Sequence, residues 1–227
     1  LLRSKSGVVL TKAGEKLNLE ARALLEYWTN LKEESMKDEE QVRGIYRLGI
    51  HSSVALYTLP AFGAEVLQQF PNLELRLQHD LSRKITEGII SFKLDFGIVV
   101  NPVEHPDLII KELFRDEVAF YSSKKISDEN RTVLISEPDL LQTQELLSKV
   151  KAKNKEFLRT VTSSNLEVIK SMVLSGTGVG ILPGRVVGKD ASKVEVLAGF
   201  PKFKDRICLV FRHDLQKSRA ARSLGNA

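Results

Sequence analysis

The chain has 227 residues, of which 42% are hydrophobic and 28% charged, and its net charge is +5. This composition is typical of a folded protein with one large or two small domains, and it excludes a disordered chain. The mild positive charge is compatible with nucleic-acid binding but is also common among enzymes, so charge alone assigns no partner. The single cysteine, Cys208, lies in the apolar run ICLVF, which indicates a buried structural thiol and excludes a disulfide framework.

The sequence shows no sign of export or of membrane insertion. No apolar run reaches the roughly 18 residues that a membrane-spanning helix needs. The N-terminus LLRSKSGVVLTKAG lacks the apolar core and the cleavage site of a signal peptide. We therefore expect a cytoplasmic protein, and because the chain begins with Leu in what reads as the end of an earlier element, we expect it to be part of a longer one.

The first 43 residues predict a short ribbon, a long helix and a hinge. A turn at Gly7 followed by the apolar run VVL indicates a two-stranded wing, and Thr11 is the expected cap of the helix. Along this helix, small or apolar residues recur in alternating steps of three and four, as in a coiled-coil seam. The seam consists of Gly14, Leu17, Ala21, Leu24, Trp28 and Leu31.

This seam packs either on its own domain or on a second chain. We favour the second chain, because a helix of ~30 residues that precedes the first strand of a separate fold has little of its own chain to pack against. The polar stretch MKDEEQVRG that follows predicts the hinge into the next domain.

From Ile45 onward, apolar strands alternate with helical patterns, which predicts βαβ units and a mostly parallel sheet. The first unit is a buried strand, the polar turn HSS and a helix in whose first turn we expect Pro60. In LELRLQHD apolar and polar residues alternate, so we place this strand near a sheet edge. Ser82 is the expected N-cap of the next helix, and LDFGIVV is the next buried strand.

A second group of elements begins after EVAFYSS. It consists of the strand VLISEP, the helix TQELLSKVKAK, the strand EFLRTVTS, a helix from about Asn165 and the strand VGILP. The strand RICLVFR and a basic tail, KSRAARSL, close the chain. This count of elements predicts two α/β lobes with a cleft between them.

Several segments together resemble LysR-type transcriptional regulators. RSKSGVVLTKAGEKL is similar to the wing and linker-helix start of that family. LGIHSSVALYTLP, FPNLELRL and LDFGIVV are similar to the first three strands of its effector domain, and VIKSMVLSGTGVGILP to a later helix and strand. The order of these motifs, over nearly the whole chain, makes the match specific. One departure is Phe92, which stands where the family usually ends a helix with Gly, so we assume no left-handed glycine cap there.

The resemblance implies an α/β effector domain of the two-lobed, periplasmic-binding-protein-like (type 2) fold, preceded by a long linker helix. Residues 1–10 would be the remnant of a winged helix-turn-helix, 11–43 the linker and dimerisation helix, and 44–227 the effector-binding domain. Subdomain I would span about 45–116 and 209–227, and subdomain II about 117–208.

The resemblance also implies partners and a function. The protein would be a cytoplasmic homodimer or homotetramer that binds DNA through a helix-turn-helix missing from this chain. It would regulate transcription allosterically in response to a small-molecule effector, without any other cofactor. The alternative is a solute-binding protein of the periplasmic type 2 fold, which would need an export signal and would have no use for a dimerising helix before its first strand.

By the same resemblance, the effector contacts polar residues in turns at one edge of the sheet. Each of these residues also stands where a helix needs a cap, so capping is the alternative role for every one of them. The convergence of several such turns favours binding of a small, acidic effector, because helix N-termini offer N–H groups to anions. The residues are Ser52, Ser53, Ser82, Asn101, Gln142, Thr143, Thr162, Ser163, Ser164 and Asn165.

Two further sets of residues are candidates for contacts with macromolecules. Arg3, Lys5 and Lys12 would contact DNA phosphates, with a solvated basic face as the alternative. The dimer surface would comprise residues of the linker helix, of the first helix of the effector domain and of its second strand. These are Leu17, Leu24, Trp28, Leu31, Phe62, Val66 and Leu75.

Enzyme motifs are missing from the sequence. The string GTGVG follows a helix and precedes a strand, which is the reverse of a dinucleotide-binding fingerprint. GxSxG, HExxH and CxxC do not occur. The four histidines, His51, His79, His105 and His213, lack the spacing of a metal site, so we expect neither catalysis nor a bound metal.

Overall fold

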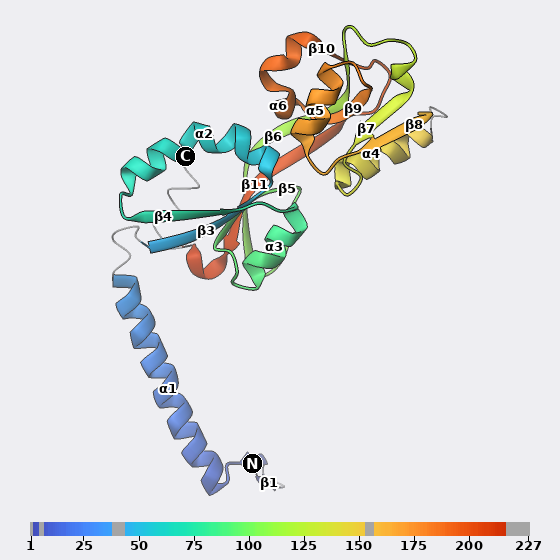
Figure 1. Ribbon diagram of the computed structural model, residues 1–227. Coiled ribbons are helices and arrows are strands. Elements are labelled where there is room, and N and C mark those ends of the chain that lie inside the picture. The colour runs from blue at the N-terminus through green and yellow to red at the C-terminus, as the bar shows by residue number, and fades with distance from the viewer. Residues whose placement is uncertain (1, 5–6, 38–43, 153–156, 217–227) are drawn as a thin grey trace. The chain divides into compact units, whose positions relative to one another are not determined.

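The computed structural model describes residues 2–4, 7–37, 44–152 and 157–216 (Figure 1). Lys5 and the basic segment after residue 216 lie outside the described residues, as do the side chains of Arg3 and Leu31. The chain divides into two compact units, Leu1–Arg43 and Gly44–Ala227.

The first unit is a hairpin followed by a long helix. Strands β1 (Leu2–Ser4) and β2 (Gly7–Val9) pair antiparallel, and α1 spans Lys12–Lys37. Thr11 caps α1, because its hydroxyl oxygen accepts a hydrogen bond from the N–H of Gly14 at 3.0 Å. Leu17, Leu24 and Trp28 of the predicted seam are all exposed.

The second unit is an α/β domain with two lobes (Figure 1). The first lobe contains α2 (Ser52–Gln69), α3 (Ser82–Ile90) and the strands β3 (Gly44–Ile50), β4 (Leu73–Gln78) and β5 (Phe96–Val100). The second contains α4 (Leu141–Lys151), α5 (Leu166–Leu174), α6 (Gly184–Val187), β7 (Val133–Ser136), β8 (Arg159–Thr162), β9 (Val179–Pro183), β10 (Val194–Val196) and the short helices η2 (Asn130–Thr132) and η3 (Gly188–Lys193). Strands β6 (Leu108–Ser123) and β11 (Phe203–Arg212) extend through both lobes, and η4 (His213–Leu215) follows β11.

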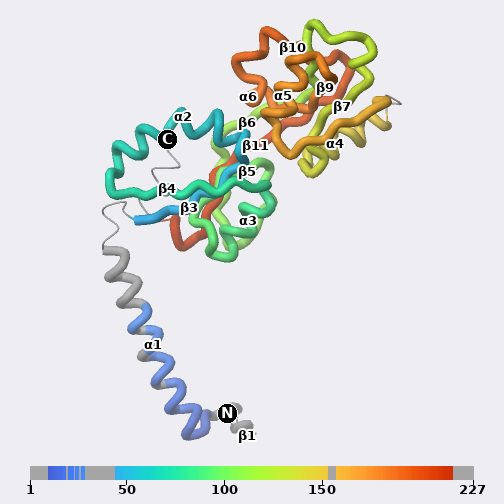
Figure 2. Tube along the Cα trace, in the orientation of Figure 1, coloured from blue at the N-terminus to red at the C-terminus, as the bar shows by residue number. Residues whose placement is uncertain are grey.

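The sheet is mixed rather than mostly parallel, which corrects the prediction. Its order is β4-β3-β5-β11-β6-β9-β7-β8, and β10 pairs with β6. The pairs at both ends are parallel, whereas β11 is antiparallel to both β5 and β6, and β6 is antiparallel to β9. The reason is that β6 and β11, which lie side by side in Figure 2, run between the lobes in opposite directions. Strand β4 lies at the sheet edge, as its alternating sequence predicts.

Each lobe has its own hydrophobic core. In the first lobe, α3 packs on β5 through Ile85 and Ile89, and Cys208 is buried in the same cluster, as predicted. This packing requires Gly97, because a Cβ there would lie 2.7 Å from a methyl group of each of the two isoleucines. The second lobe has two separate clusters, one that includes Ile169 of α5 and one that includes Leu146 of α4. None of the helices in the described ranges combines the length and the apolar character needed to span a bilayer.

Two helix starts differ from the prediction. Helix α2 begins at Ser52, so Pro60 lies in its interior and leaves the carbonyl of Leu56 without its helical partner. Leu56 and Pro60 are on the exposed side of α2, where water can solvate that carbonyl. Helix α3 begins at Ser82 itself, after the N-cap Leu81. The Ser82 hydroxyl accepts a hydrogen bond from the N–H of Val100 at 2.9 Å instead of capping the helix.

The outer surface of α2 also corrects one predicted contact. Val66 is only 4% exposed, so its side chain belongs to the core of its own domain. Leu67, the next residue on α2, is exposed instead. Phe62 and Leu75 are half-buried. Helical geometry explains the difference, since neighbouring residues point in directions about 100° apart.

Helix α3 ends in a left-handed cap although the residue there is not glycine. Phe92 has φ 60°, and the N–H groups of Phe92 and Lys93 donate to the carbonyls of Ile89 and Gly88 at 3.2 and 2.9 Å. A side chain in this conformation costs roughly 1–2 kcal/mol. The guanidinium of Arg212 lies 4.2 Å from the centre of the Phe92 ring, which offsets part of that cost.

Arg212 also joins β11 to the end of α3. It is almost fully buried, and its Nη1 donates to the carbonyls of Ile89 and Leu94 at 2.8 and 2.9 Å.

We predict that Arg212→Met lowers the free energy of unfolding by about 3 kcal/mol, because two buried carbonyls lose a charged donor. Urea denaturation of the 227-residue chain measures this. Arg159→Met, on the exposed surface of β8, is the matched control, and equal losses in the two variants would contradict the prediction.

Candidate functional site

A cavity of about 720 Å³ lies at the junction of the two lobes. Its volume is within the range of small-molecule sites, which is about 300–1,000 Å³. Its wall comes from the start of α2, the N-termini of α3 and α4, the end of β5, the first residue of α5 and the part of β11 that contains Asp205. The residues that matter below are His51, Ser53, Tyr57, Ser82, Asn101, Gln142 and Asp205, with Arg83, Lys84 and Asp139 among the others in the wall.

Four of the ten residues predicted for effector binding line this cavity. They are Ser53, Ser82, Asn101 and Gln142. Ser52, Thr143 and the segment 162–165 lie elsewhere: Thr143 is buried and Ser52 half-buried, whereas Thr162, Ser164 and Asn165 are exposed and Ser163 is half-buried. Asn165 has the alternative role, because its Oδ1 accepts hydrogen bonds from the first turn of α5 at 2.9 and 3.4 Å.

Ser53 has a polar atom without a partner inside the cavity wall. The residue is 1% exposed, and its Oγ makes no hydrogen bond to any described residue. An unpaired buried hydroxyl costs roughly 1–3 kcal/mol relative to a paired one. The Ser53 hydroxyl is therefore an unpaired polar atom just behind the cavity surface, and a polar ligand group that reached it would relieve this cost.

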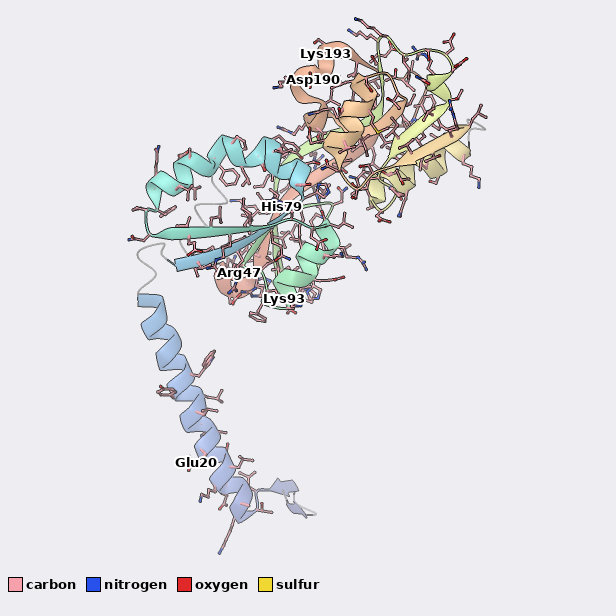
Figure 3. All side chains as sticks on the ribbon, viewed as in Figure 1. Glu20, Arg47, His79, Lys93, Asp190 and Lys193 are labelled. Atoms are coloured by element: carbon pink, nitrogen blue, oxygen red, sulfur yellow. The ribbon has the colours of Figure 1, made fainter. Side chains whose placement is uncertain are left out.

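His51, next to Ser53, is held neutral. Burial, reinforced by the nearby His79, lowers the pKa of His51. The Nδ1 of His51 accepts a hydrogen bond from the N–H of Ser53 at 3.3 Å, so the proton of the neutral ring is on Nε2. His79 lies beyond the end of β4, as Figure 3 shows, and its Nδ1 is 3.0 Å from the carbonyl of Ile50. Both rings therefore stabilise the turn that carries Ser53.

Helices α3 and α4 both begin at the cavity. Their N-cap residues are Leu81 and Leu140, and neither side chain accepts a hydrogen bond from the first turn. Such helix N-termini have N–H groups that can bind an anion. The wall between Ser53 and the start of α3 therefore favours a negatively charged group.

Asp205, on β11, was not among the predicted residues. It is 3% exposed, its Oδ1 accepts a hydrogen bond from Asn101 Nδ2 at 2.7 Å, and its Oδ2 accepts one from Gln142 Nε2 at 3.4 Å. Asn101 adopts φ 51° and accepts the N–H of Arg206 at 2.9 Å, which aims its amide at the carboxylate. Burial, with a contribution from Asp116, raises the pKa of Asp205 to about 6, although the Asn101 hydrogen bond opposes this shift.

Tyr57 extends from α2 of the first lobe to the second. Its ring packs against the second-lobe core and lies edge-on to Phe114, with the ring centroids 6.3 Å apart. The guanidinium of Arg185, in α6, lies over the ring of Phe114, 4.2 Å from its centre. Arg185 also donates its N–H to Asp116 Oδ2 at 3.0 Å. One side chain of the cavity wall is thus part of the contact between the lobes.

The acidic, histidine and cysteine side chains of the described residues form no metal-binding cluster. Within the part of the chain that the structure describes, no three His, Cys, Asp or Glu side chains come close enough to hold a metal ion. Figure 3 shows the ion pair between Asp190 and Lys193 far out on the second lobe, away from Arg47 and Lys93 on the first.

The raised pKa of Asp205 predicts a pH dependence of stability. A folded-state pKa of about 6, above the unfolded value of about 3.9, means that the folded chain binds more protons between about pH 4 and pH 6. Stability contributed by the protonated group is present below pH 4 and is lost as pH rises through 6. We expect Asp205→Asn to raise the free energy of unfolding by about 2 kcal/mol at pH 7.5, and by little at pH 4.

Urea denaturation across this pH range measures the effect, with Asp139→Asn, on the exposed rim of the cavity, as the control. A gain in stability that is the same at pH 4 and pH 7.5 would show that the charge of Asp205 is not its cause.

Known proteins share both the sequence pattern and the fold. The family described as the LysR substrate binding domain matches residues 39–227. A probable hydrogen peroxide-inducible genes activator from Streptomyces viridosporus is 25% identical over 205 residues, which cover 85% of this chain and 66% of that protein. The HTH-type transcriptional regulator YofA from Bacillus subtilis is 25% identical over 224 residues, covering 93% of this chain and 76% of YofA.

Among solved structures, full-length OxyR from Pseudomonas aeruginosa, in a variant form, superposes with a TM-score of 0.66 at 22% identity, covering 99% of this chain and 82% of OxyR. At this identity the likeness concerns the fold, and it confirms the predicted two-lobed type 2 fold. The chain spans about two thirds of the length of the first relative, 66%. Since the family match covers most of the chain, the resemblance seen in its motifs is confirmed: the chain belongs to the LysR substrate-binding domain family.

Proposed function

We propose that this chain is the linker and effector-sensing part of a bacterial, cytoplasmic transcriptional regulator of the LysR type. The regulator binds DNA through a domain outside these 227 residues and changes transcription when a small molecule binds between the lobes. The observation that carries the sensing role is the cavity at the lobe junction, with the buried, unpaired Ser53 hydroxyl in its wall. The family match and the regulator names of the relatives support the DNA-linked role.

The effector in this proposal carries an acidic group. Three features of one wall region support this: the Ser53 hydroxyl, the Nε2–H of neutral His51 and the start of α3. Hydrogen-bond donors at a helix N-terminus stabilise a carboxylate better than a neutral group. Ser82, Asn101 and Gln142 are the further predicted residues in contact range of such a ligand.

The regulatory step is a population shift between lobe arrangements. The cavity wall takes residues from both lobes, and among the described strands only β6 and β11 join the lobes. An effector that contacts both walls binds one arrangement more tightly and thereby raises its population. In the full regulator, this shift alters the arrangement of paired linker helices and hence the spacing of the DNA-binding domains.

Dimerisation in this proposal uses two surfaces. The seam of α1 is exposed at Leu17, Leu24 and Trp28, as a partner helix requires. The second surface is α2 with the edge strand β4. It contains the predicted residues Phe62 and Leu75 and also the exposed Leu67 and Leu77. Contacts with DNA phosphates by Lys12, which is exposed, and by Arg3 and Lys5 remain part of the same proposal.

Two other functions, solute binding and a response to peroxide, receive less support. The relatives are named as HTH-type regulators rather than as transport proteins, which favours regulation over solute binding. The word peroxide in the name of one relative does not carry over to this chain. Its single thiol, Cys208, is buried in β11, and burial raises the pKa of that thiol, so reactive thiolate is scarce at neutral pH.

The effector role is tested by screening small carboxylates for a rise in the melting temperature of the chain. We expect Ser53→Ala to abolish the rise, because the alanine removes the unpaired hydroxyl and adds no atom to the buried site. Ser164→Ala, an exposed residue outside the cavity, is the control and should keep the rise. A carboxylate that passes this test should also change the DNA footprint of the full-length regulator.

Binders that are all cationic or wholly apolar would contradict the acidic effector. A footprint that stays the same with and without a true binder would contradict the regulatory step.

The linker role is tested by the oligomeric state. We expect Leu24→Glu to break the dimer that forms through the α1 seam, so that the chain sediments as a smaller species at micromolar concentration, because a charge in a coiled-coil seam cannot be buried. Arg22→Glu places an acidic side chain on α1 next to the seam but outside it, and should leave the dimer intact. Dissociation by both variants, or by neither, would count against pairing through this seam.

A further inference from the structure

Among the residues that the structure describes, no cation pairs with the carboxylate of Asp205. Its two hydrogen-bond donors, Asn101 and Gln142, are uncharged amides. None of the ion pairs in the described part of the chain involves Asp205. Buried charges in proteins are usually paired, so this one is unusual.

The cations in the cavity wall do not compensate for this charge. Arg83 and Lys84 lie on the exposed side of α3, where they pair with Glu87 at 3.9 Å and with Asp80 at 3.5 Å. Their side chains are 82% and 56% exposed, so they point to solvent rather than to the buried hinge.

The carboxylate also has room for a further donor. A carboxylate offers about four acceptor positions, and two of those on Asp205 are used by the amides. The Gln142 contact is long, at 3.4 Å, and so contributes little. Asn101 holds the carboxylate in place, and Asp205 is one of the residues that line the cavity.

The part of the wall around Ser53 favours a negatively charged group instead. Strand β3, which leads into Ser53, is separated from β11 by β5 alone. Two strand spacings place these wall sections on the order of 10 Å apart. At the Ser53 end the wall presents hydrogen-bond donors, and at the Asp205 end it presents a buried acceptor with a negative charge.

We propose that the effector is a small zwitterion, such as an amino acid, whose carboxylate binds at Ser53 and the start of α3 and whose ammonium group binds Asp205. This inference rests on the proposed function, since it assigns the second end of the same ligand. An ammonium group supplies the cation that the protein lacks at Asp205, and it can donate to both carboxylate oxygens.

The position of Asp205 connects this ligand group to the hinge. Asn101 follows β5 of the first lobe, and Gln142 lies in α4 of the second, so the carboxylate is bonded to both lobes. An ammonium group between these amides contacts each lobe at once. Ligands without the ammonium group occupy only the Ser53 end and are expected to shift the lobe equilibrium less.

The inference is tested with matched probes on the 227-residue chain. The panel consists of the common L-amino acids, the carboxylic acids that lack their amino group, and the amines that lack their carboxylate. Calorimetric titration at pH 7.5 compares the wild-type chain with Asp205→Asn and with Asp128→Asn, an exposed carboxylate outside the cavity wall.

We expect at least one amino acid to bind the wild type about tenfold more tightly than its matched acid, or better, since about 1.4 kcal/mol from one ion pair suffices for this factor. Asp205→Asn should remove the preference while leaving the matched acid unchanged, and Asp128→Asn should keep it. Unchanged binding of the matched acid by Asp205→Asn shows that the variant is folded, so loss of the preference is then not a result of unfolding.

Two results would overturn the inference while leaving the proposed function in place: matched acids that bind as tightly as the amino acids, or a preference that survives Asp205→Asn. Failure of every acid and every amino acid in the panel to bind would overturn both. Binding of amines alone would also overturn both, because it removes the acidic group from the effector.

Discussion

The antiparallel pairing of β11 with β6 is the constraint on which the rest of the domain depends. Its register runs from Phe203 opposite Val118 to Arg212 opposite Leu108, so one pair of strands passes through both lobes. The register shifts between Ile207 and Cys208, two residues beyond Asp205. Such an irregularity increases the local twist and lets two lobes share one sheet at different angles. The cavity lies beside this point.

Strand β11 has three different tasks along its length. At its start Phe203 packs against the second-lobe core, and at its end Arg212 bonds to the last turn of α3 in the first lobe. Between them lies Asp205, where burial raises the pKa of the carboxyl to about 6. A buried charge in the wall of a cavity is typical of a functional position, because a ligand of opposite charge can relieve the cost of its burial.

Much of the fold follows from the sequence, because local patterns determine it. The alternation in LELRLQHD places β4 at an edge, and the apolar run around Cys208 places that thiol in the core. The motifs also identify the family, since the turns and strand ends that they describe are formed within short segments. Four cavity residues could be predicted, because each stands in a turn or at a helix start that the local sequence indicates. They are Ser53, Ser82, Asn101 and Gln142.

The remaining features depend on contacts between distant residues. Asp205 lies between Lys204 and Arg206 in the sequence, and nothing in that pattern tells which of the three points into the domain. The position of Pro60 inside α2 and the left-handed Phe92 are tolerated for reasons that lie elsewhere: solvent access at Leu56 and the guanidinium of Arg212. The direction of β11 is fixed only by its pairing partners, so a count of strands predicted the wrong sheet type.

The two attachments of α3 have a mechanical consequence. At its N-terminus the Ser82 hydroxyl is bonded to Val100, and at its C-terminus two carbonyls near the cap are bonded to Arg212. A helix of nine residues, about 13 Å long, that is fastened to the sheet at both ends acts as a strut. A ligand that pulls on the first turn of α3 therefore displaces the whole first lobe as one body, and the deformation is concentrated in the two strands that leave it.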